Sequence, residues 1–452
     1  MISPIYLFMG SALFMMDLLP EYSYLAIKGE FSNARTLATL SRKRLTDVQS
    51  IAYMDQAAGD MSMLLGDYEK AEKFYARAIA GLAGSVNLRA VSCHCTGIQA
   101  LFRNRFDIAV HCFRRNIEDN VLVEYKLLGF VALALIYREA GLEKLASEIF
   151  LKLNELEEKT LCPIIRAITD IVKLDLTTYR TIYASPSMGD HIYRNPNDIV
   201  NDEIYKSNVF HDISTASTLE KSIFVFLQSR KEHLIKICDL ALGKPVDWED
   251  FQVHLTSKFV VGSRLSLKYT CLEIGLAAIS GENIAIQQKV VENYPWIGNI
   301  NKKKQNVGMR IDRLDHLFFL SKYKMSMGSI NEGNIIYDHY VIDAFKALDK
   351  ITNELNKIAS HGLADSVVLK LHEDEIPVMR KLQTPIPVRC MQAFDYIKEN
   401  SLNYKLSVQE VADIVGVSAR WLQMMFKLHY GCSPKMLIRT KKILYVNPKS
   451  SY

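Results

Sequence analysis

The residues whose types most clearly suggest a chemical role lie near the end of the chain, where positive charge is concentrated. Residues 381–452 carry eleven Lys and Arg against four Asp and Glu, whereas the rest of the chain carries 44 Lys and Arg against 46 Asp and Glu. Within this segment, Arg420, Gln423 and Lys427 recur at intervals that place them on one face of a helix. The excess of Lys and Arg in this segment suits contact with phosphate groups, and an ordinary solvated basic face is the alternative explanation.

Three helices are predicted to position these side chains. The first spans about 391–400. The second begins at the N-cap Ser407, with Glu410 three residues later in a capping-box arrangement. It carries a single apolar stripe at i, i+3, i+4 and i+7. The third helix is expected to bury Leu422, Met425 and Phe426 and to turn outward Ala419, Arg420, Gln423, Met424 and Lys427.

A tight turn is predicted between the second and third helices. Gly416 tolerates the left-handed backbone conformation, and Ser418 is placed to cap the third helix. Ala412 lies where two closely crossing helices need a small residue. The pattern therefore predicts a tri-helical unit whose third helix fits a DNA major groove, with its basic flanks against phosphates.

This stretch resembles the AraC/XylS type of DNA-binding domain. The family pattern combines a capped helix, a Gly-x-Ser turn, an aromatic-Leu pair, Phe-Lys, Gly-x-Ser-Pro and a basic helix. The resemblance spans residues 391–443 and implies a sequence-specific, DNA-binding transcription regulator. The matching residues are Leu406, Ala412, Gly416, Ser418, Trp421-Leu422, Phe426-Lys427, Gly431-Cys432-Ser433-Pro434 and Arg439-Thr440-Lys441-Lys442-Ile443.

The resemblance implies which side chains contact double-stranded DNA. Arg420, Gln423 and Met424 would face the bases, since Arg pairs with guanine, Gln with adenine, and Met touches a thymine methyl group. Lys427, Lys435, Arg439, Lys441 and Lys442 would contact phosphates and make binding strongly salt dependent. The predicted DNA-binding set is Ser418, Ala419, Arg420, Gln423, Met424, Lys427, Lys435, Arg439 and Lys441.

The chain departs from the family pattern in its length. Family members carry two helix-turn-helix units joined by a long helix, and here Asn447-Pro448 is expected to end that helix shortly before Tyr452. The second unit is therefore expected to be missing. Leu437 also stands where the family commonly has Tyr. A single recognition helix makes few contacts, so we expect binding to require a homodimer or a partner.

The first third of the chain repeats itself. Anchor residues recur after 37, 38 and 37 residues, each behind a turn and each followed four positions later by an apolar or small residue. Gly59 and Gly97 lie seven residues before two of the turns, where a small residue lets helices approach closely. The pattern predicts tandem helical hairpins and resembles the tetratricopeptide repeat, most plainly over 66–78. An irregular helical bundle is the alternative. The anchors are Ala34, Ala71, Ala109 and Ala146, and the residues four positions later are Ala38, Tyr75, Phe113 and Phe150.

The chain as a whole is predicted to be all-α. The expected divisions are tetratricopeptide-like repeats over 1–180, a further helical region over 181–370, a linker over 371–388 and a truncated helix-turn-helix domain over 389–452. A polar stretch over 177–202 predicts a loop, and three prolines mark the linker. Two later turns, 281–283 and 328–330, resemble worn repeat turns in which the anchor register is expected to be lost.

The sequence contains none of the usual patterns of an enzyme, a metal site or a membrane span. Phosphate-binding glycine loops, nucleophile motifs and His–carboxylate pairs at ligand spacing are absent, and the eight Cys lack the paired spacing of zinc ligands. We therefore expect no enzymatic activity, no cofactor, and a cytoplasmic location. The helical body is expected to sense a signal, to dimerise or to bind proteins. The alternative function is a helical-repeat scaffold for a peptide or protein, with a C-terminal module that does not bind DNA.

Overall fold

The computed structural model describes most of the chain, and it is helical throughout. Described are residues 12–85, 87–103, 105–118, 123–139, 143–160, 163–191, 218–297, 310–341, 387–400, 406–430 and 433–435, with isolated positions 343, 344, 347 and 438. No strand occurs among these residues. The predicted all-α fold is therefore confirmed.

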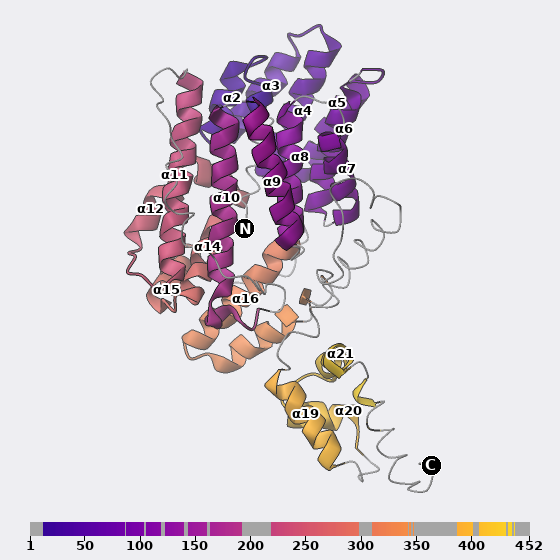
Figure 1. The fold of residues 1–452 in the computed structure, drawn as a ribbon, viewed down its shortest axis with the longest axis vertical. Helices are drawn as coiled ribbons and strands as arrows, with labels where there is room; N and C mark the ends of the chain where they lie inside the picture. The colour runs from indigo at the N-terminus through magenta and orange to yellow at the C-terminus, as the bar shows by residue number, and fades with distance from the viewer. Residues whose placement is uncertain are drawn as a thin grey trace.

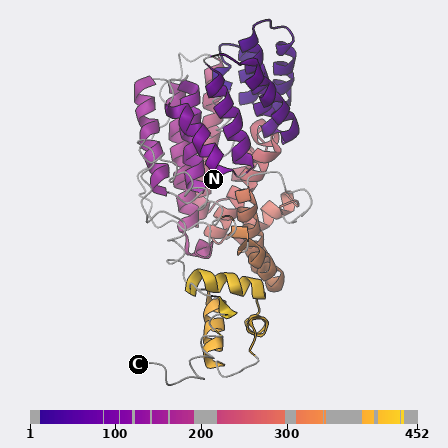
Figure 2. The same cartoon turned by 90° about the vertical axis from the view of Figure 1, so that its right-hand side faces the viewer.

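The helices form a large body and a small C-terminal unit, which lies at one end of the body in two perpendicular views (Figures 1 and 2). The unit consists of α19 (Val388–Glu399), α20 (Val408–Ile414) and α21 (Ala419–Tyr430). The body contains α2 (Pro20–Ile27), α3 (Phe31–Arg42), α4 (Val48–Leu64), α5 (Tyr68–Gly81), α6 (Leu88–Phe102), α7 (Phe106–Glu118), α8 (Val123–Glu139), α9 (Glu143–Thr160), α10 (Pro163–Ala184), the 3-10 turn η1 (Pro186–Met188), α11 (Thr218–Ala241), α12 (Glu249–Leu255), α13 (Lys258–Val261), α14 (Arg264–Ser280), α15 (Ile284–Asn293), α16 (Arg310–Ser326) and a helix over 330–341.

The repeat anchors occupy equivalent buried positions in successive hairpins of the body. The four alanines Ala34, Ala71, Ala109 and Ala146 are fully buried, each on the second helix of its hairpin. Of the residues four positions later, Ala38, Tyr75 and Phe113 are fully buried, and Phe150 is half-buried. The predicted helical-repeat body is confirmed. Pro20 occupies the first turn of α2, where proline fits a helix, so the helix before Ala34 is intact.

Glycines on the inner helices allow the close approach that their spacing predicts. A methyl group on Gly59 would lie 2.5 Å from the ring of Tyr75, and one on Gly97 would lie 2.8 Å from the ring of Phe113. These distances are shorter than any ordinary van der Waals contact. The aromatic ring of each second helix therefore packs directly on the backbone of the first.

The turn geometry persists where the anchor register was expected to be lost. Gly29, Gly66, Glu282 and Gly328 all adopt positive φ, between 55° and 81°. In each turn the following amide donates to a carbonyl five residues earlier, as in the Schellman motif that ends many helices, with N···O distances of 2.8 to 2.9 Å. The hairpins α14–α15 and α16–(330–341) therefore repeat the geometry of the first third. The two turns that the sequence indicated as worn repeat turns thus keep the repeat geometry, although Glu282 stands where Gly29, Gly66 and Gly328 stand in the other turns.

The loop predicted from residue 177 begins later than expected. Residues 177–184 belong to α10, because the hydroxyl groups of Thr177, Thr178 and Thr181 each donate to the carbonyl four residues earlier, at 2.9 to 3.1 Å. The polar appearance of this stretch thus reflects hydroxyls satisfied within a helix. The helix also runs through the division expected at residue 180. Residues 192–202 of the loop and nearly all of the 371–388 linker lie outside the described residues.

The body folds back so that its first hairpins touch α13 and α14. Lys258 Nζ lies 3.1 Å from Glu30 Oε1, and Ser263 Oγ donates to the carbonyl of Leu64 at 2.7 Å. A methyl group on Gly262 would lie 2.0 Å from the carbonyl oxygen of Gly29. The two backbones therefore meet at van der Waals distance.

The inner helices of the folded-back body are covered on all sides. Residues 52–64 of α4, 127–138 of α8 and 269–280 of α14 are buried at every position, so all sides of these helix segments are covered by other parts of the chain. A peptide partner of the repeat region remains a prediction. If one exists, it must bind somewhere other than these three inner helices.

Candidate nucleic-acid interface

The C-terminal unit is built on a small apolar core. Cys390, Ala393 and Ile397 form the buried face of α19. Phe394 packs against Phe426 of α21 with ring centroids 6.4 Å apart. The predicted first helix is present, and it begins three residues earlier than expected, directly after Pro387.

The turn between α20 and α21 has the geometry that its residues predict. Ser407 caps α20 by accepting a hydrogen bond from the amide of Glu410 at 3.1 Å, and Ser418 caps α21 by accepting one from the amide of Trp421 at 3.1 Å. Gly416 adopts a φ of 67°. The amide of Val417 donates to the carbonyl of Ala412 at 2.9 Å, which closes the end of α20.

Burial separates the two faces of α21. Leu422, Met425 and Phe426 are buried as predicted, and Trp421 is buried beside them. The opposite face carries the predicted candidates: Ser418, Arg420 and Gln423 are exposed, whereas Ala419 and Met424 are half-buried and pack against the core. Arg420 and Gln423 thus offer hydrogen-bond donors to solvent from one face of a capped helix, while Met424 presents only part of its side chain.

The described residues include only part of the predicted phosphate-contacting set. Lys435 is exposed, next to Pro434 and Ile438, which are buried against the unit. Lys427 lies within α21, but its side chain is outside the described residues, as are Arg439, Lys441 and Lys442.

One residue of the unit, Arg389, was not identified from the sequence. Arg389 Nη1 donates to the carbonyl of Gly416 at 3.0 Å and so ties the start of α19 to the turn before α21. Trp421 is buried, and its indole N–H has no acceptor among the described residues. The Arg389 contact joins residues 27 positions apart, so no local pattern could have revealed it.

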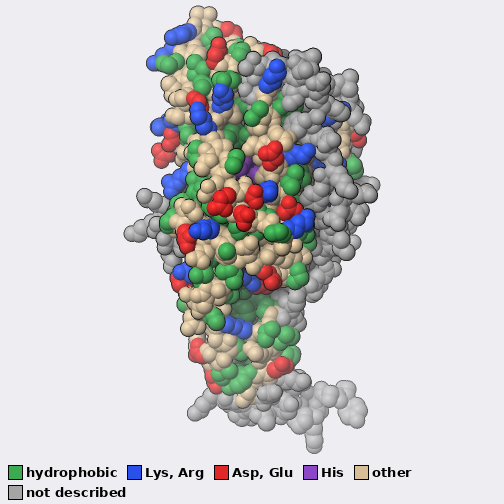
Figure 3. All heavy atoms as spheres, turned by 90° about the vertical axis from the view of Figure 1, so that its left-hand side faces the viewer, with side chains coloured by type: hydrophobic (Ala, Val, Ile, Leu, Met, Phe, Trp, Pro, Cys, Tyr) green, Lys and Arg blue, Asp and Glu red, His purple; other side chains and the backbone are tan. Residues whose placement is uncertain are grey.

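The body presents a different charge from the C-terminal segment. On the face over α11 and α12, acidic side chains gather near the middle (Figure 3). The exposed residues there include Asp247, Glu249 and Asp250. Asp250 pairs with Lys236 at 3.1 Å, so this acidic group is partly neutralised, and it contrasts with the excess of Lys and Arg in residues 381–452.

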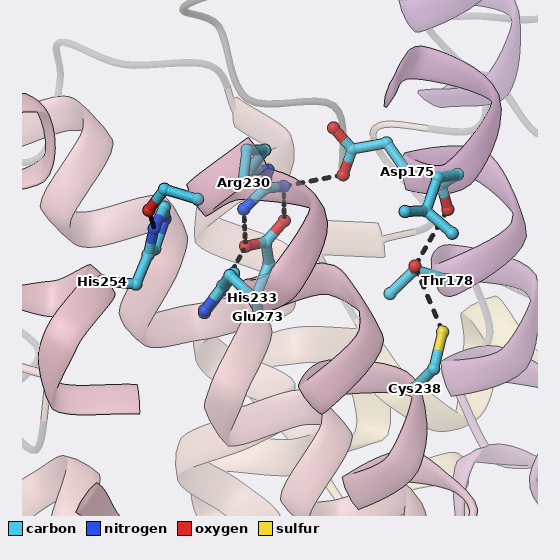
Figure 4. Close-up of polar contacts among 9 residues, drawn as sticks. Asp175, Thr178, Arg230, His233, Cys238, His254 and Glu273 are labelled. Carbon is cyan, nitrogen blue, oxygen red and sulfur yellow. Dashed lines mark hydrogen bonds and ion pairs between the residues drawn. The ribbon is translucent and has the colours of Figure 1, made fainter. Parts of the chain in front are cut away.

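A second group of polar residues lies buried in the body, between α10, α11 and α14 (Figure 4). Arg230 donates to both carboxylate oxygens of Glu273, at 2.7 and 2.5 Å, and to Asp175 at 2.7 Å. His233 Nε2 lies 3.4 Å from Glu273, and the ring of His254 stacks on His233 with centroids 4.1 Å apart. The group links three helices at their centres.

Charge and burial oppose each other at this network. Burial raises the pKa of Glu273, but the charge and hydrogen bonds of Arg230 outweigh it and hold the pKa at about 2. Burial also lowers the pKa of His233, and it lowers that of His254 further with help from the neighbouring His233 and Arg230. At neutral pH the network therefore contains an ionised Arg–carboxylate group beside two neutral imidazoles, and its hydrogen bonds join α10, α11 and α14.

The described residues contain no group of three His, Cys, Asp or Glu side chains placed to hold a metal ion. Cys93, His94 and Cys95 follow one another in α6, and His94 Nε2 lies 3.0 Å from Asp60 Oδ1 in the core. In that described part of the chain, no helix is both long enough and apolar enough to cross a membrane.

Comparison with known proteins gives one informative similarity. The chain is 25% identical over 448 residues to a protein described as Regulatory protein HrpB from Ralstonia nicotianae, a match that covers 98% of this chain and 90% of that protein. The similarity includes both the body and the C-terminal unit. No protein-family description matches the chain, and no solved structure matches it. The resemblances to AraC/XylS domains and to tetratricopeptide repeats therefore stay predictions.

Proposed function

We propose that this chain is a sequence-specific DNA-binding transcription regulator. Two observations support the proposal: the chain is similar over nearly its whole length to a regulatory protein, and its capped helix α21 exposes Arg420 and Gln423. The helical body would sense a signal, mediate dimerisation or bind proteins, and α21 would read DNA. The observation that carries the proposal is the exposed pair Arg420 and Gln423, one helical turn apart on a helix whose other face is buried.

The chemistry of this pair fits base recognition. The guanidinium group of Arg420 matches the two acceptors of guanine in the major groove, and the amide of Gln423 matches the donor and acceptor of adenine. Ser418, at the start of α21, and Lys435 are exposed polar groups that would contact the phosphates. Because α21 is a single reading helix, tight binding would need two copies of the chain on a site with two half-sites.

The test uses the full-length protein and random DNA. Sequences that the wild type retains are selected and sequenced, and affinities for the selected site and for scrambled DNA are then measured by fluorescence anisotropy. Arg420→Ala and Gln423→Ala are each expected to weaken binding to the selected site by about tenfold or more, in line with a loss of roughly 1–3 kcal/mol per bidentate contact. Binding to scrambled DNA should change little.

The matched control is Gln392→Ala, which removes an exposed amide from the outer face of α19 and should leave both affinities unchanged. Equal binding of selected and scrambled DNA by the folded wild type would contradict sequence-specific reading. Equal losses for Gln392→Ala and Gln423→Ala would contradict the assignment of α21 as the reading helix.

A further inference from the structure

Arg138 is a fully buried side chain whose charge has no partner in the described part of the chain. It lies in the last turn of α8, is 0% exposed, and none of its three side-chain nitrogens has a hydrogen-bond acceptor among the described residues. The other buried arginines differ. Arg114 pairs with Glu118 at 3.0 Å, and Arg230 pairs with Glu273 at 2.5 Å.

The guanidinium group of Arg138 has a defined position. Its central carbon lies 3.4 Å from the centroid of the Tyr179 ring on α10, which is a stacked cation–π contact. Tyr179 is itself buried and packs against Tyr183 with centroids 4.4 Å apart. Stacking covers a flat face of the guanidinium group and leaves its N–H groups directed sideways, in the plane where a carboxylate or phosphate accepts two parallel hydrogen bonds.

An unmatched charge in this position is unfavourable. The free energy needed to remove an ion from water exceeds the stabilisation that a cation–π contact and the partial negative charge of a helix C-terminus provide together. The acidic residue nearest along α10, Asp175, lies one turn before Tyr179 and accepts a hydrogen bond from Arg230 at 2.7 Å. A bound anion would complete the hydrogen bonding of Arg138.

We propose that Arg138 binds the carboxylate of a small organic acid at an effector site between α8 and α10. A single positive charge among buried apolar neighbours such as Ala134 and Leu135 matches a monoanion better than a dianionic phosphate. Full burial favours a compact ligand over a peptide. The inference does not rest on DNA binding.

The test measures thermal unfolding of the full-length protein in acetate, benzoate, inorganic phosphate and chloride at constant ionic strength. At least one carboxylate should raise the wild-type Tm saturably, by about 5 °C, relative to chloride. Arg138→Met should abolish this rise, and its Tm in chloride should equal or exceed that of the wild type, because an apolar side chain replaces an unmatched charge. Arg138→Lys should respond weakly, since it lacks the two-pronged geometry.

The matched control is Arg114→Met, which removes a buried arginine that already has a carboxylate partner; it should keep the response to carboxylates. Three results would overturn the proposal. One is a wild type that responds to neither carboxylate. Another is a response to phosphate alone. The third is a lower Tm in chloride for Arg138→Met with no change in the carboxylate response, which would indicate that Arg138 pairs within the chain. If Arg138→Met fails to fold, the comparison of wild type with Arg138→Lys decides between these outcomes.

Discussion

At the scale of single residues, Gly416 forms the turn that joins α20 to α21. Its φ of 67° is unfavourable for other residues, and a methyl group there would meet no atom within 4 Å. Gly416→Ala should therefore cost only backbone strain, about 1 kcal/mol. Amide hydrogen exchange is expected to speed up in α20 and α21 and to stay constant in the body.

Gly416→Asn is the informative companion variant, because Asn tolerates the left-handed region better than Ala. This variant should restore most of the protection against amide hydrogen exchange that Gly416→Ala loses. If the two variants exchange alike, then something other than the φ value makes glycine necessary at this position.

The stacked pair His233 and His254 predicts a pH dependence. The pKa of His254 is lowered well below its ordinary value by burial and by His233 and Arg230, so the folded state keeps it neutral while the unfolded state takes up a proton near pH 6.5. The resulting stability is present above about pH 6.5 and is lost as the pH falls below it. A single histidine contributes at most about 1.4 kcal/mol of this loss at pH 5.5.

His254→Phe keeps an aromatic ring against His233 and removes the titration. Urea unfolding at pH 7.5 and pH 5.5 should show a smaller loss of stability for this variant than for the wild type. His339→Phe, at an exposed position, should behave like the wild type. A wild type that is equally stable at the two pH values would rule out the proposed linkage.

Residue-scale features were predictable where they depend on near neighbours in the chain. The caps at Ser407 and Ser418, the left-handed Gly416 and the buried stripe of α21 each involve residues within five positions. The contact of Arg389 with the Gly416 carbonyl and the missing partner of Arg138 depend on how distant helices pack. No pattern of types and spacings contains that information.

At the scale of helices, the close crossing of α4 and α5 predicts a steric effect. A methyl group on Gly59 meets the Tyr75 ring at 2.5 Å, and the ring is held by a 2.6 Å hydrogen bond from its hydroxyl to Asp60 Oδ1. Gly59→Ala should destabilise the protein by roughly 1–3 kcal/mol through overpacking. Chemical denaturation measures the change.

Gly81→Ala is the matched control in the same hairpin, where the nearest atom is the Ala52 side chain at 3.3 Å. Its stability should stay within about 1 kcal/mol of the wild type, because the gain in helix propensity offsets a tighter contact. Equal effects of the two substitutions would show that the Tyr75 contact is not what requires glycine at position 59.

The all-helical fold was predictable from the sequence, but the geometry of some turns and the bounds of some helices were not. The spacing of the alanine anchors predicts the early hairpins because each buries the same small side chain at the same point. The later turns were recognised only as worn copies whose full geometry escaped prediction, since Glu282 adopts a glycine-like conformation. The extent of α10 also escaped, because its threonine hydroxyls bond to the backbone of their own helix.

At the scale of the whole molecule, the contact between Gly29 and Gly262 joins the first hairpins to the second half of the body. Gly262→Ala places a methyl group 2.0 Å from the Gly29 carbonyl oxygen, so the two segments must separate. Hydrogen exchange should rise together in residues 20–42 and 258–280, which lie more than 200 positions apart. Protection in α19 to α21 should not change.

Gly243→Ala serves as the control. The added methyl group would lie 3.9 Å from the nearest atom, so only the φ of 71° makes this substitution unfavourable. It should raise exchange locally, around the end of α11. A purely local effect of Gly262→Ala would show that the first hairpins hold their place without this contact. The contact itself could not be foreseen, because it depends on the curvature accumulated over every hairpin between the two glycines.

The contact of Gly29 with α13 limits how the protein could change in evolution. An open array of hairpins gains or loses a unit at modest cost, since each unit touches only its neighbours. Here an extra unit of 37 or 38 residues, the interval between the anchors, would rotate and shift every later helix, and residue 262 would no longer reach residue 29. The number of hairpins between these two points is therefore set by geometry, and inserted or duplicated sequence should be tolerated in the turns but not as whole units.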